Sequence, residues 1–143
     1  MINLAESDRS LIEAFDRCIA EHLRSGVAIK FLWIHVLANH GEVHFYPTER
    51  ADIQHPEDEL LGAIVGHTAE IQEWQNGCEF RLPDGTAATA RDARERQQII
   101  AAHVARTLFQ RASAQDPASV PARIVLHSES GEFETAWETP GLP

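Results

Sequence analysis

Histidines are the side chains of this sequence that first suggest chemistry. Eight occur among 143 residues, and His35, His40 and His44 surround one expected turn. A two-residue turn at Asn39-His40 places His35 and His44 opposite each other on paired strands, whereas a turn at His40-Gly41 leaves them offset. A zinc site needs three or four converging ligands. The sequence has no H-E-x-x-H, no H-x-x-x-H on an expected helix and no Cys/His cluster. We therefore favour surface or edge histidines and expect no metal and no other cofactor.

General acid–base chemistry is the second candidate, because an expected cross-strand contact places His127 opposite Glu134 near the C-terminus. A nearby carboxylate favours the imidazolium form of a histidine. On a solvated sheet face, however, such a pair is usually modest structural support. The sequence also lacks a G-x-S-x-G elbow, a phosphate-binding glycine loop and a dinucleotide fingerprint. Cys18 and Cys78 have no C-x-x-C partner, so we expect both to be small core residues. Because none of these catalytic patterns is present, we expect that the protein is not an enzyme.

Residues 121–139 are the most informative stretch of the chain. A two-residue turn at Ser130-Gly131 pairs the flanking runs as antiparallel strands, with Ile124 opposite Trp137 and Leu126 opposite Thr135. Side chains alternate across a strand, so one surface of this hairpin is apolar and the other is acidic. The apolar surface has Ile124, Leu126, Phe133 and Trp137, and the acidic surface has His127, Glu129, Glu132 and Glu134.

The charge balance favours some partners over others. Twenty-two acidic residues against twelve basic residues give a net charge of −10. Such a surface repels nucleic acid and membrane headgroups and accelerates encounter with a basic protein. Acidity that only maintains solubility is the simpler interpretation. No apolar run approaches the ~20 residues of a membrane helix. The N-terminus lacks the basic start and apolar stretch of a secretory signal, so we expect a cytoplasmic protein.

Hydrophobic periodicity predicts two long helices and several strands. In one strand, Phe31 and Trp33 point one way while Leu32 and Ile34 point the other, the pattern of a central strand covered on both faces. Pro47 is expected to end the following strand. The expected elements are a helix over 4–24, strands over 27–38 and 42–46, a short helix or irregular segment over 59–67, a hairpin of 69–74 with 78–82 across Asn76-Gly77, a turn at 83–85, a helix over 89–112 and the terminal hairpin.

This order of elements predicts a single α+β domain over residues 1–143. We expect two layers, an antiparallel sheet with two long helices packed on one face, because that arrangement buries the apolar stripes of both helices. The arginines of the second helix are expected mostly outward. Residues 113–120, rich in Ala, Ser and Pro, are expected to link this helix to the terminal hairpin, and residues 140–143 to form a tail.

The same organisation resembles a known family. The helix–hairpin–helix–hairpin order, the second strand Val43-His-Phe-Tyr46 and the terminal stretch from Ile124 to Trp137 are similar to YezG-like bacterial immunity proteins. The resemblance covers about residues 5–47 and 91–138. It implies a cytoplasmic antitoxin that occludes a cognate toxin, often a nuclease, without turnover.

A basic toxin domain is therefore the expected partner, with carboxylates of this chain meeting its basic cleft. The charge pattern indicates two candidate patches of partner-binding residues. The first is Glu129, Glu132, Glu134 and Glu138 on the terminal hairpin, and the second is Glu57, Asp58 and Glu59. Glu70 and Glu73 extend the second patch. Two other hypotheses remain open. One is an acidic secretion-chaperone-like homodimer, and the other is a small metal-binding enzyme that uses His35, His44 or His127.

Overall fold

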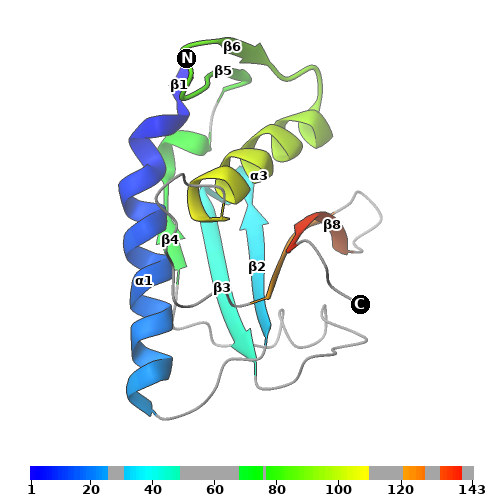
Figure 1. The fold of residues 1–143 in the computed structure, drawn as a ribbon. Coiled ribbons are helices and arrows are strands. Elements are labelled where there is room, and N and C mark those ends of the chain that lie inside the picture. The colour runs from blue at the N-terminus through cyan, green and yellow to red at the C-terminus, as the bar shows by residue number, and fades with distance from the viewer. Residues whose placement is uncertain (26–30, 49–67, 76, 110–120, 128–132, 140–143) are drawn as a thin grey trace.

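A sheet with the helices α1 (Asp8–Ser25) and α3 (Ala93–Phe109) on one face forms the body of the molecule (Figure 1). In this computed structural model we describe residues 1–25, 31–48, 68–75, 77–109, 121–127 and 133–139. The sheet contains β2 (Phe31–Leu37), β3 (Glu42–Thr48), β4 (Thr68–Glu70), β7 (Ala122–His127) and β8 (Phe133–Glu138), in the order β4-β3-β2-β7-β8. The predicted α+β class is confirmed. The sheet departs from a purely antiparallel one at a single described pair, because β2 and β7 run parallel.

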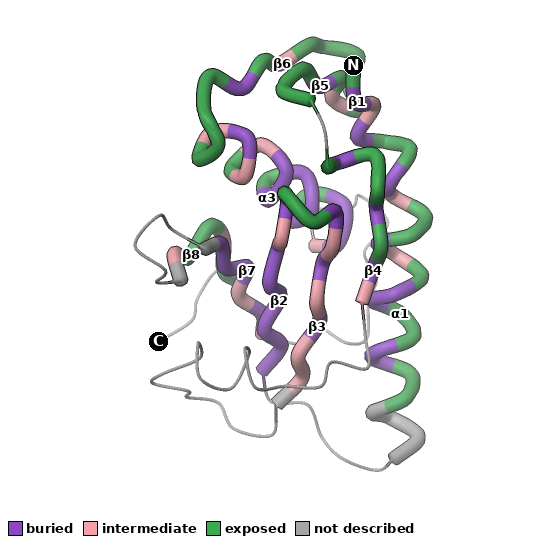
Figure 2. Tube along the Cα trace, turned by 180° about the vertical axis from the view of Figure 1, so that it is seen from behind, coloured by how far each residue is buried: buried purple, intermediate pink, exposed green. Residues whose placement is uncertain are grey.

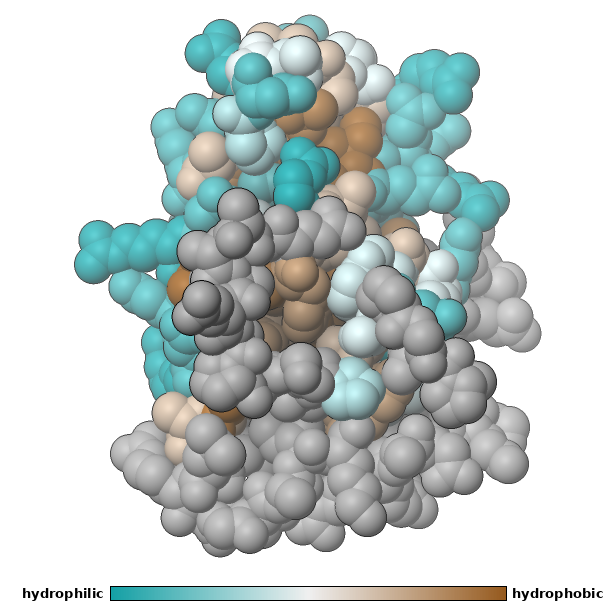
Figure 3. All heavy atoms as spheres, in the orientation of Figure 1, coloured by the Kyte–Doolittle hydropathy of each residue, from teal (hydrophilic) through white to brown (hydrophobic). Residues whose placement is uncertain are grey.

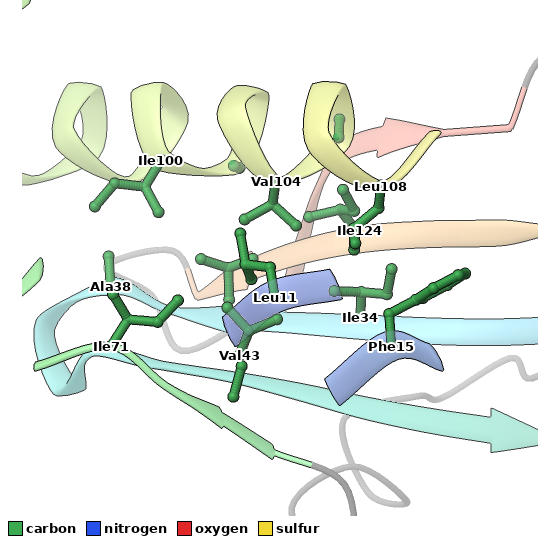
Figure 4. Packing of buried hydrophobic residues seen from close by; sticks show 14 of the residues in the cluster. Leu11, Phe15, Ile34, Ala38, Val43, Ile71, Ile100, Val104, Leu108 and Ile124 are labelled. Carbon is green, nitrogen blue, oxygen red and sulfur yellow. The ribbon is translucent and has the colours of Figure 1, made fainter. Parts of the chain in front are cut away.

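Strand β2 is buried on both faces, as its sequence pattern predicts. Leu32, Ile34 and Val36 belong to the main core beneath the helices. Figure 4 shows Ile34 beside Leu11 and Phe15 of α1, with Leu108 of α3 above it. On the opposite face, Phe31 and Trp33 pack with Val125 in a second cluster. Buried residues accordingly run along β2 in Figure 2 up to its last residue, Leu37, which is intermediate.

A side-chain cap lies at or before the start of each helix. Asn3 accepts a hydrogen bond from the backbone N–H of Ala5 at 3.2 Å and caps the short 3-10 helix η1 (Leu4–Ser7), which leads into α1. Asp92 accepts from the N–H of Glu95 at 2.8 Å at the start of α3. Such caps satisfy N–H groups that have no partner inside the helix. The predicted helices are therefore confirmed, each starting about one turn later than expected, and the predicted helical Thr89 lies in a strand.

A small second sheet was not predicted. It pairs β1 (Ile2–Asn3) in parallel with β5 (Glu79–Arg81), and β5 antiparallel with β6 (Ala87–Thr89). The expected turn at 83–85 joins β5 to β6, with Asp84 accepting from the N–H of Thr86 at 2.9 Å. The expected hairpin of 69–74 with 78–82 is wrong. Strand β4 pairs with β3 in the large sheet, whereas β5 belongs to the small one.

The chain leaves the large sheet after β4 because two apolar side chains go to the core. Ile71 and Trp74 are buried, and the short 3-10 helix η3 (Gln72–Trp74) turns the chain between them. The N–H of Ile71 donates to the carbonyl of Gly41 at 2.6 Å. Gly41 has φ +66°, and a Cβ there would collide with the Ile71 carbonyl, so only glycine fits at this position. Gly41 follows the 3-10 turn η2 (Ala38–His40), which replaces the expected two-residue turn.

Pro47 lies inside β3 and does not end it, contrary to expectation. It pairs with Leu32 in the antiparallel register. The N–H of Leu32 donates to the carbonyl of Pro121 at 2.8 Å, so it points toward β7 and away from β3. The Leu32–Pro47 pair is then of the kind that exchanges no ladder hydrogen bonds, and a residue without an N–H is tolerated there.

The terminal hairpin contains a bulge that shifts its register. Ile124 lies opposite Trp137 as predicted, but Leu126 lies opposite Glu134 instead of Thr135, and His127 opposite Phe133 instead of Glu134. Ala136 is the extra residue. Because partners across a strand pair share a face, the shift moves Glu134 from the expected acidic surface to the helix-facing one. The expected His127–Glu134 pair is therefore wrong.

Several other expectations fall outside the described residues. These are the short helix or irregular segment over 59–67, the linker 113–120, the turn at Ser130-Gly131 and the tail 140–143.

Truncating Leu126 tests the packing of this hairpin. Leu126 is 2% exposed within the main core, so Leu126→Ala should lower the free energy of unfolding by about 2–4 kcal/mol. Thr135→Ala, at an exposed position of the same hairpin, is the control and should change it by less than about 0.5 kcal/mol. Urea unfolding followed by tryptophan fluorescence measures both. Equal effects of the two substitutions would contradict this packing.

Candidate functional site

The two described carboxylates of the predicted partner-binding set are each bound by an arginine of the same chain. Glu134 accepts a hydrogen bond from Nη2 of Arg94 at 2.7 Å, and Glu138 accepts from Nε of Arg123 at 3.0 Å. Both pairs are partly exposed to solvent. Their charges are thus largely neutralised within the molecule. The remaining candidates, Glu129, Glu132, Glu57, Asp58 and Glu59, lie outside the described residues.

Arg123 is itself held by aromatic rings, which fixes the position of Glu138. Its guanidinium carbon lies 5.6 Å from the ring centre of Phe31 and 5.2 Å from that of Trp33. A guanidinium over an aromatic face is attracted by the ring quadrupole. Arg123 and Glu138 therefore extend the second apolar cluster of β2 and form part of its cover.

The histidines of the β2–β3 turn do not assemble a metal site. His35 and His44 lie opposite each other, with ring centres 6.3 Å apart. His35 is buried, His40 is exposed, and Nε2 of His44 is 2.9 Å from a carboxylate oxygen of Glu42. Across the described ranges, no three His, Cys, Asp or Glu side chains converge as metal ligands would. The pairing of His35 with His44 agrees with one of the two expected turns, although the turn itself is longer.

Carboxylates without an internal ion pair gather instead at the end of the molecule that carries the small sheet. Glu6, Glu73 and Glu79 line a groove of about 550 Å³. Met1, Ile2, Asn3 and Glu6 form one part of its lining, which we call the N-terminal wall, and the neighbouring Gly77 and Cys78 form a second part, the Gly77 wall. The three glutamates are exposed and form no ion pair with any described residue. On the face seen in Figure 3, hydrophilic side chains project around the margin of the described surface and apolar ones gather nearer its middle.

Arg96 fixes the wall of this groove from behind. Its Nε donates to the carbonyl of Gly77 at 2.8 Å, and Nη1 lies 3.4 Å from the side-chain oxygen of Asn39. The residue is 6% exposed and has no carboxylate partner within the described ranges. Burial lowers the pKa of the guanidinium, while Cys78 opposes that shift. The arginines expected to point mostly outward do so at Arg94 and Arg106 of α3 and at Arg91 just before it, whereas Arg96 is the buried exception among the described ones.

A polar cluster also joins the N-terminal stretch to α3. Nε2 of His103 is 2.7 Å from Oδ1 of Asp8, and the hydroxyl of Thr107 donates to the same oxygen at 3.2 Å. We call these three residues the His103 cluster. Burial lowers the pKa of His103, and the charge of Asp8 opposes this.

The His103 cluster has the composition of a nucleophile, base and acid, but its geometry does not suit that role. In a catalytic relay the hydroxyl and the carboxylate contact different ring nitrogens. Here the hydroxyl of Thr107 lies 3.3 Å from Nε2, the same nitrogen that contacts Asp8. His103 is fully buried and Thr107 nearly so, so a substrate has no access to either. The cluster is a structural link between α1 and α3.

Helical spacing was the signal that could have identified both buried bases. Arg96, Ile100 and Val104 recur every four residues, and His103 and Thr107 have the same spacing. Residues four apart share one face of a helix. Arg96 and His103 are therefore on the apolar stripe of α3, where a buried partner must be sought for each polar side chain.

The two cysteines differ in their surroundings. Cys18 is buried on α1, as predicted, and burial together with the charge of Glu21 raises the pKa of its thiol to about 12. Cys78 is exposed in the groove, so its predicted place in the core is wrong. Cys18 and Cys78 form no disulfide with each other.

In comparisons with known proteins, the chain matches no protein-family model, no curated protein and no solved structure. None of the described helices is long and apolar enough to cross a membrane.

Thiol labelling tests the exposure of the groove. Iodoacetamide at about pH 7.5 should modify Cys78 in the native protein and leave Cys18 unmodified, because only the thiolate reacts and Cys18 is kept protonated and buried. Peptide mass spectrometry after quenching locates the label. Cys18→Ser should label like the unaltered protein, and Cys78→Ser should label only after denaturation. Rapid labelling of native Cys18 would show that the core around α1 is open.

Proposed function

We propose that this chain is a protein-binding module of the immunity type, which neutralises a basic partner by occluding it. The partner is a basic cognate toxin domain, such as a nuclease that grips nucleic acid through a basic cleft, and the chain makes and breaks no covalent bond. The observation that supports this proposal is the groove of about 550 Å³ lined by Glu6, Glu73 and Glu79, none of which forms an ion pair with a described residue. The resemblance to YezG-like immunity proteins points to the same role.

Charge and shape both favour a basic segment as the occupant of the groove. The net charge of −10 draws basic proteins toward the molecule. Within the groove, the exposed side chain of Met1 lies beside the carboxylates. Lysine and arginine have long apolar stems that pack on such surfaces while the charged end reaches a carboxylate. A charge-assisted hydrogen bond to each glutamate would then fix the segment.

The groove is a better docking site than the described part of the terminal hairpin. A partner that binds Glu134 or Glu138 must first displace Arg94 or Arg123. Such an exchange of one ion pair for another gains little free energy. Glu73 needs no such exchange and belongs to the second patch that the charge pattern indicated.

Removing two carboxylates from the groove tests the proposal. The probe is a fluorescent ten-residue peptide of alternating lysine and leucine, and fluorescence anisotropy measures its dissociation constant. Glu73→Gln with Glu79→Gln should weaken binding about tenfold and reduce its salt dependence, since each partly exposed ion pair contributes up to about 1 kcal/mol. The matched control, Glu13→Gln with Asp16→Asn on the exposed side of α1, makes the same change in net charge. It should weaken binding less than about twofold, by the long-range effect alone.

Equal weakening by the two double substitutions would show that net charge, and not the groove, attracts the peptide. A version of the peptide with glutamate at each lysine position should not bind. Sedimentation of the pure protein distinguishes the immunity role from that of a secretion-chaperone-like homodimer. A stable homodimer that excludes the peptide would favour the secretion-chaperone-like role over the immunity role.

A further inference from the structure

The first seven residues lead down into the top of α1 (Figure 1). Met1, Ile2, Asn3 and Glu6 among them line the groove. Two residues of this N-terminal segment pair with β5, Ile2 opposite Phe80 and Asn3 opposite Arg81. Ile2 and Leu4 are buried in the main core. A two-residue strand adds few backbone hydrogen bonds. The segment is therefore held by these two buried side chains together with the polar side-chain contacts at its end.

The His103 cluster provides those contacts at the start of α1. A carboxylate only accepts hydrogen bonds, so the 2.7 Å contact with Asp8 places the proton of the neutral imidazole on Nε2. Nδ1 is then a buried acceptor, and no group in the described structure donates a hydrogen bond to it. A second proton on the ring must go to Nδ1, where it creates a buried charge.

We propose that the His103 cluster is a pH-sensitive contact that holds the N-terminal segment in place, and that protonation of His103 releases this segment and opens one wall of the acidic groove. In the closed state the imidazole is fully buried beneath the segment, whereas Asp8 is partly exposed. When residues 1–8 move away from α3, the imidazole reaches water and takes a proton without penalty. Acid therefore favours the open state.

The charges around His103 determine the direction of this effect. From α1, the carboxylate of Asp8 favours the protonated ring, as does the carbonyl of Leu4 from η1. On α3 itself, Arg106 disfavours it, and burial disfavours it most. The net result is a pKa below the usual value in the closed state. The closed state thus binds fewer protons than the open state, and its stability falls as the pH drops below the ordinary histidine value of about 6.5.

Hydrogen exchange on the free, full-length protein tests the release. After correction for intrinsic rates, opening of residues 2–8 should increase up to about tenfold for each pH unit below about 6.5, between about pH 7.5 and 5.5. This exchange should hardly respond to low concentrations of urea, because a local opening exposes little surface. The amides of β2, which exchange through a larger opening, should respond to urea strongly. Residues 2–8 that exchange only together with β2 would overturn the proposal.

Three variants assign the proton. His103→Gln can donate the same hydrogen bond to Asp8 but cannot titrate, so the pH response of residues 2–8 should disappear. Asp8→Asn keeps an acceptor without the charge, and the response should be at least as large as in the unaltered protein. His40→Gln, at an exposed histidine, is the control and should leave the response intact. A response that persists in His103→Gln, or vanishes in Asp8→Asn, would refute the assignment to His103.

A consequence for binding rests on the function proposed above. A basic peptide that requires both walls of the groove should bind less tightly at about pH 5.5 than at about pH 7.5, and His103→Gln should remove most of that difference. The exchange experiment contains no peptide. Failure of the peptide to bind would therefore reject the proposed function without affecting the proposed release of the N-terminal segment. Peptide binding without a pH-dependent exchange of residues 2–8 would reject the release and leave the proposed function unaffected.

Discussion

The rest of the structure depends on covering strand β2 on both faces. Six of its seven residues are buried, so apolar side chains must pack on each side of it. The helices α1 and α3 cover Leu32, Ile34 and Val36. On the other side, Val125 of β7 completes a cluster with Phe31 and Trp33, and the guanidinium of Arg123 lies over both rings. Slipping β2 by one residue would exchange its two faces. Its register with β3 and β7 is therefore strongly determined, and these strands in turn fix the places of β4 and β8.

Sequence patterns predicted the elements whose hydrophobic pattern repeats over many residues and failed for the short elements. The apolar stripes of α1 and α3 and the two-sided pattern of β2 extend over many residues, so they are legible without a structure. Strands β1, β5 and β6 have two or three residues each, which is too short for any period. The Asn76-Gly77 turn signal was misleading because the demand to bury Ile71 and Trp74 ended β4 before a hairpin could form. The bulge at Ala136 was equally hidden, since a small side chain fits on either face of a strand.

The candidate site shows the same division between local pattern and tertiary pairing. The sequence shows which residues are acidic but not which of them are neutralised. Arg94 and Glu134 are forty residues apart in the chain, and the one-residue register shift of β8 is what brings Glu134 to the side of α3. The groove, conversely, joins Glu6 to Glu73 and Glu79 through the parallel pairing of β1 with β5. Of these three, the charge pattern placed only Glu73 in a candidate patch. A patch defined by nearness in sequence cannot include residues that are far apart in the chain.

Helix α3 contacts both walls of the groove through two buried basic residues, Arg96 and His103, which differ in how they respond to pH. Arg96 and His103 are two helical turns apart on one face. Arg96 donates to the carbonyl of Gly77 on one wall, and His103 contacts Asp8 next to the other. A guanidinium stays protonated at any physiological pH even when burial lowers its pKa, so the Gly77 wall does not respond to acid. An imidazole changes charge near neutrality. The same helix therefore makes one wall permanent and the other conditional, and acid acts on the groove from its N-terminal side.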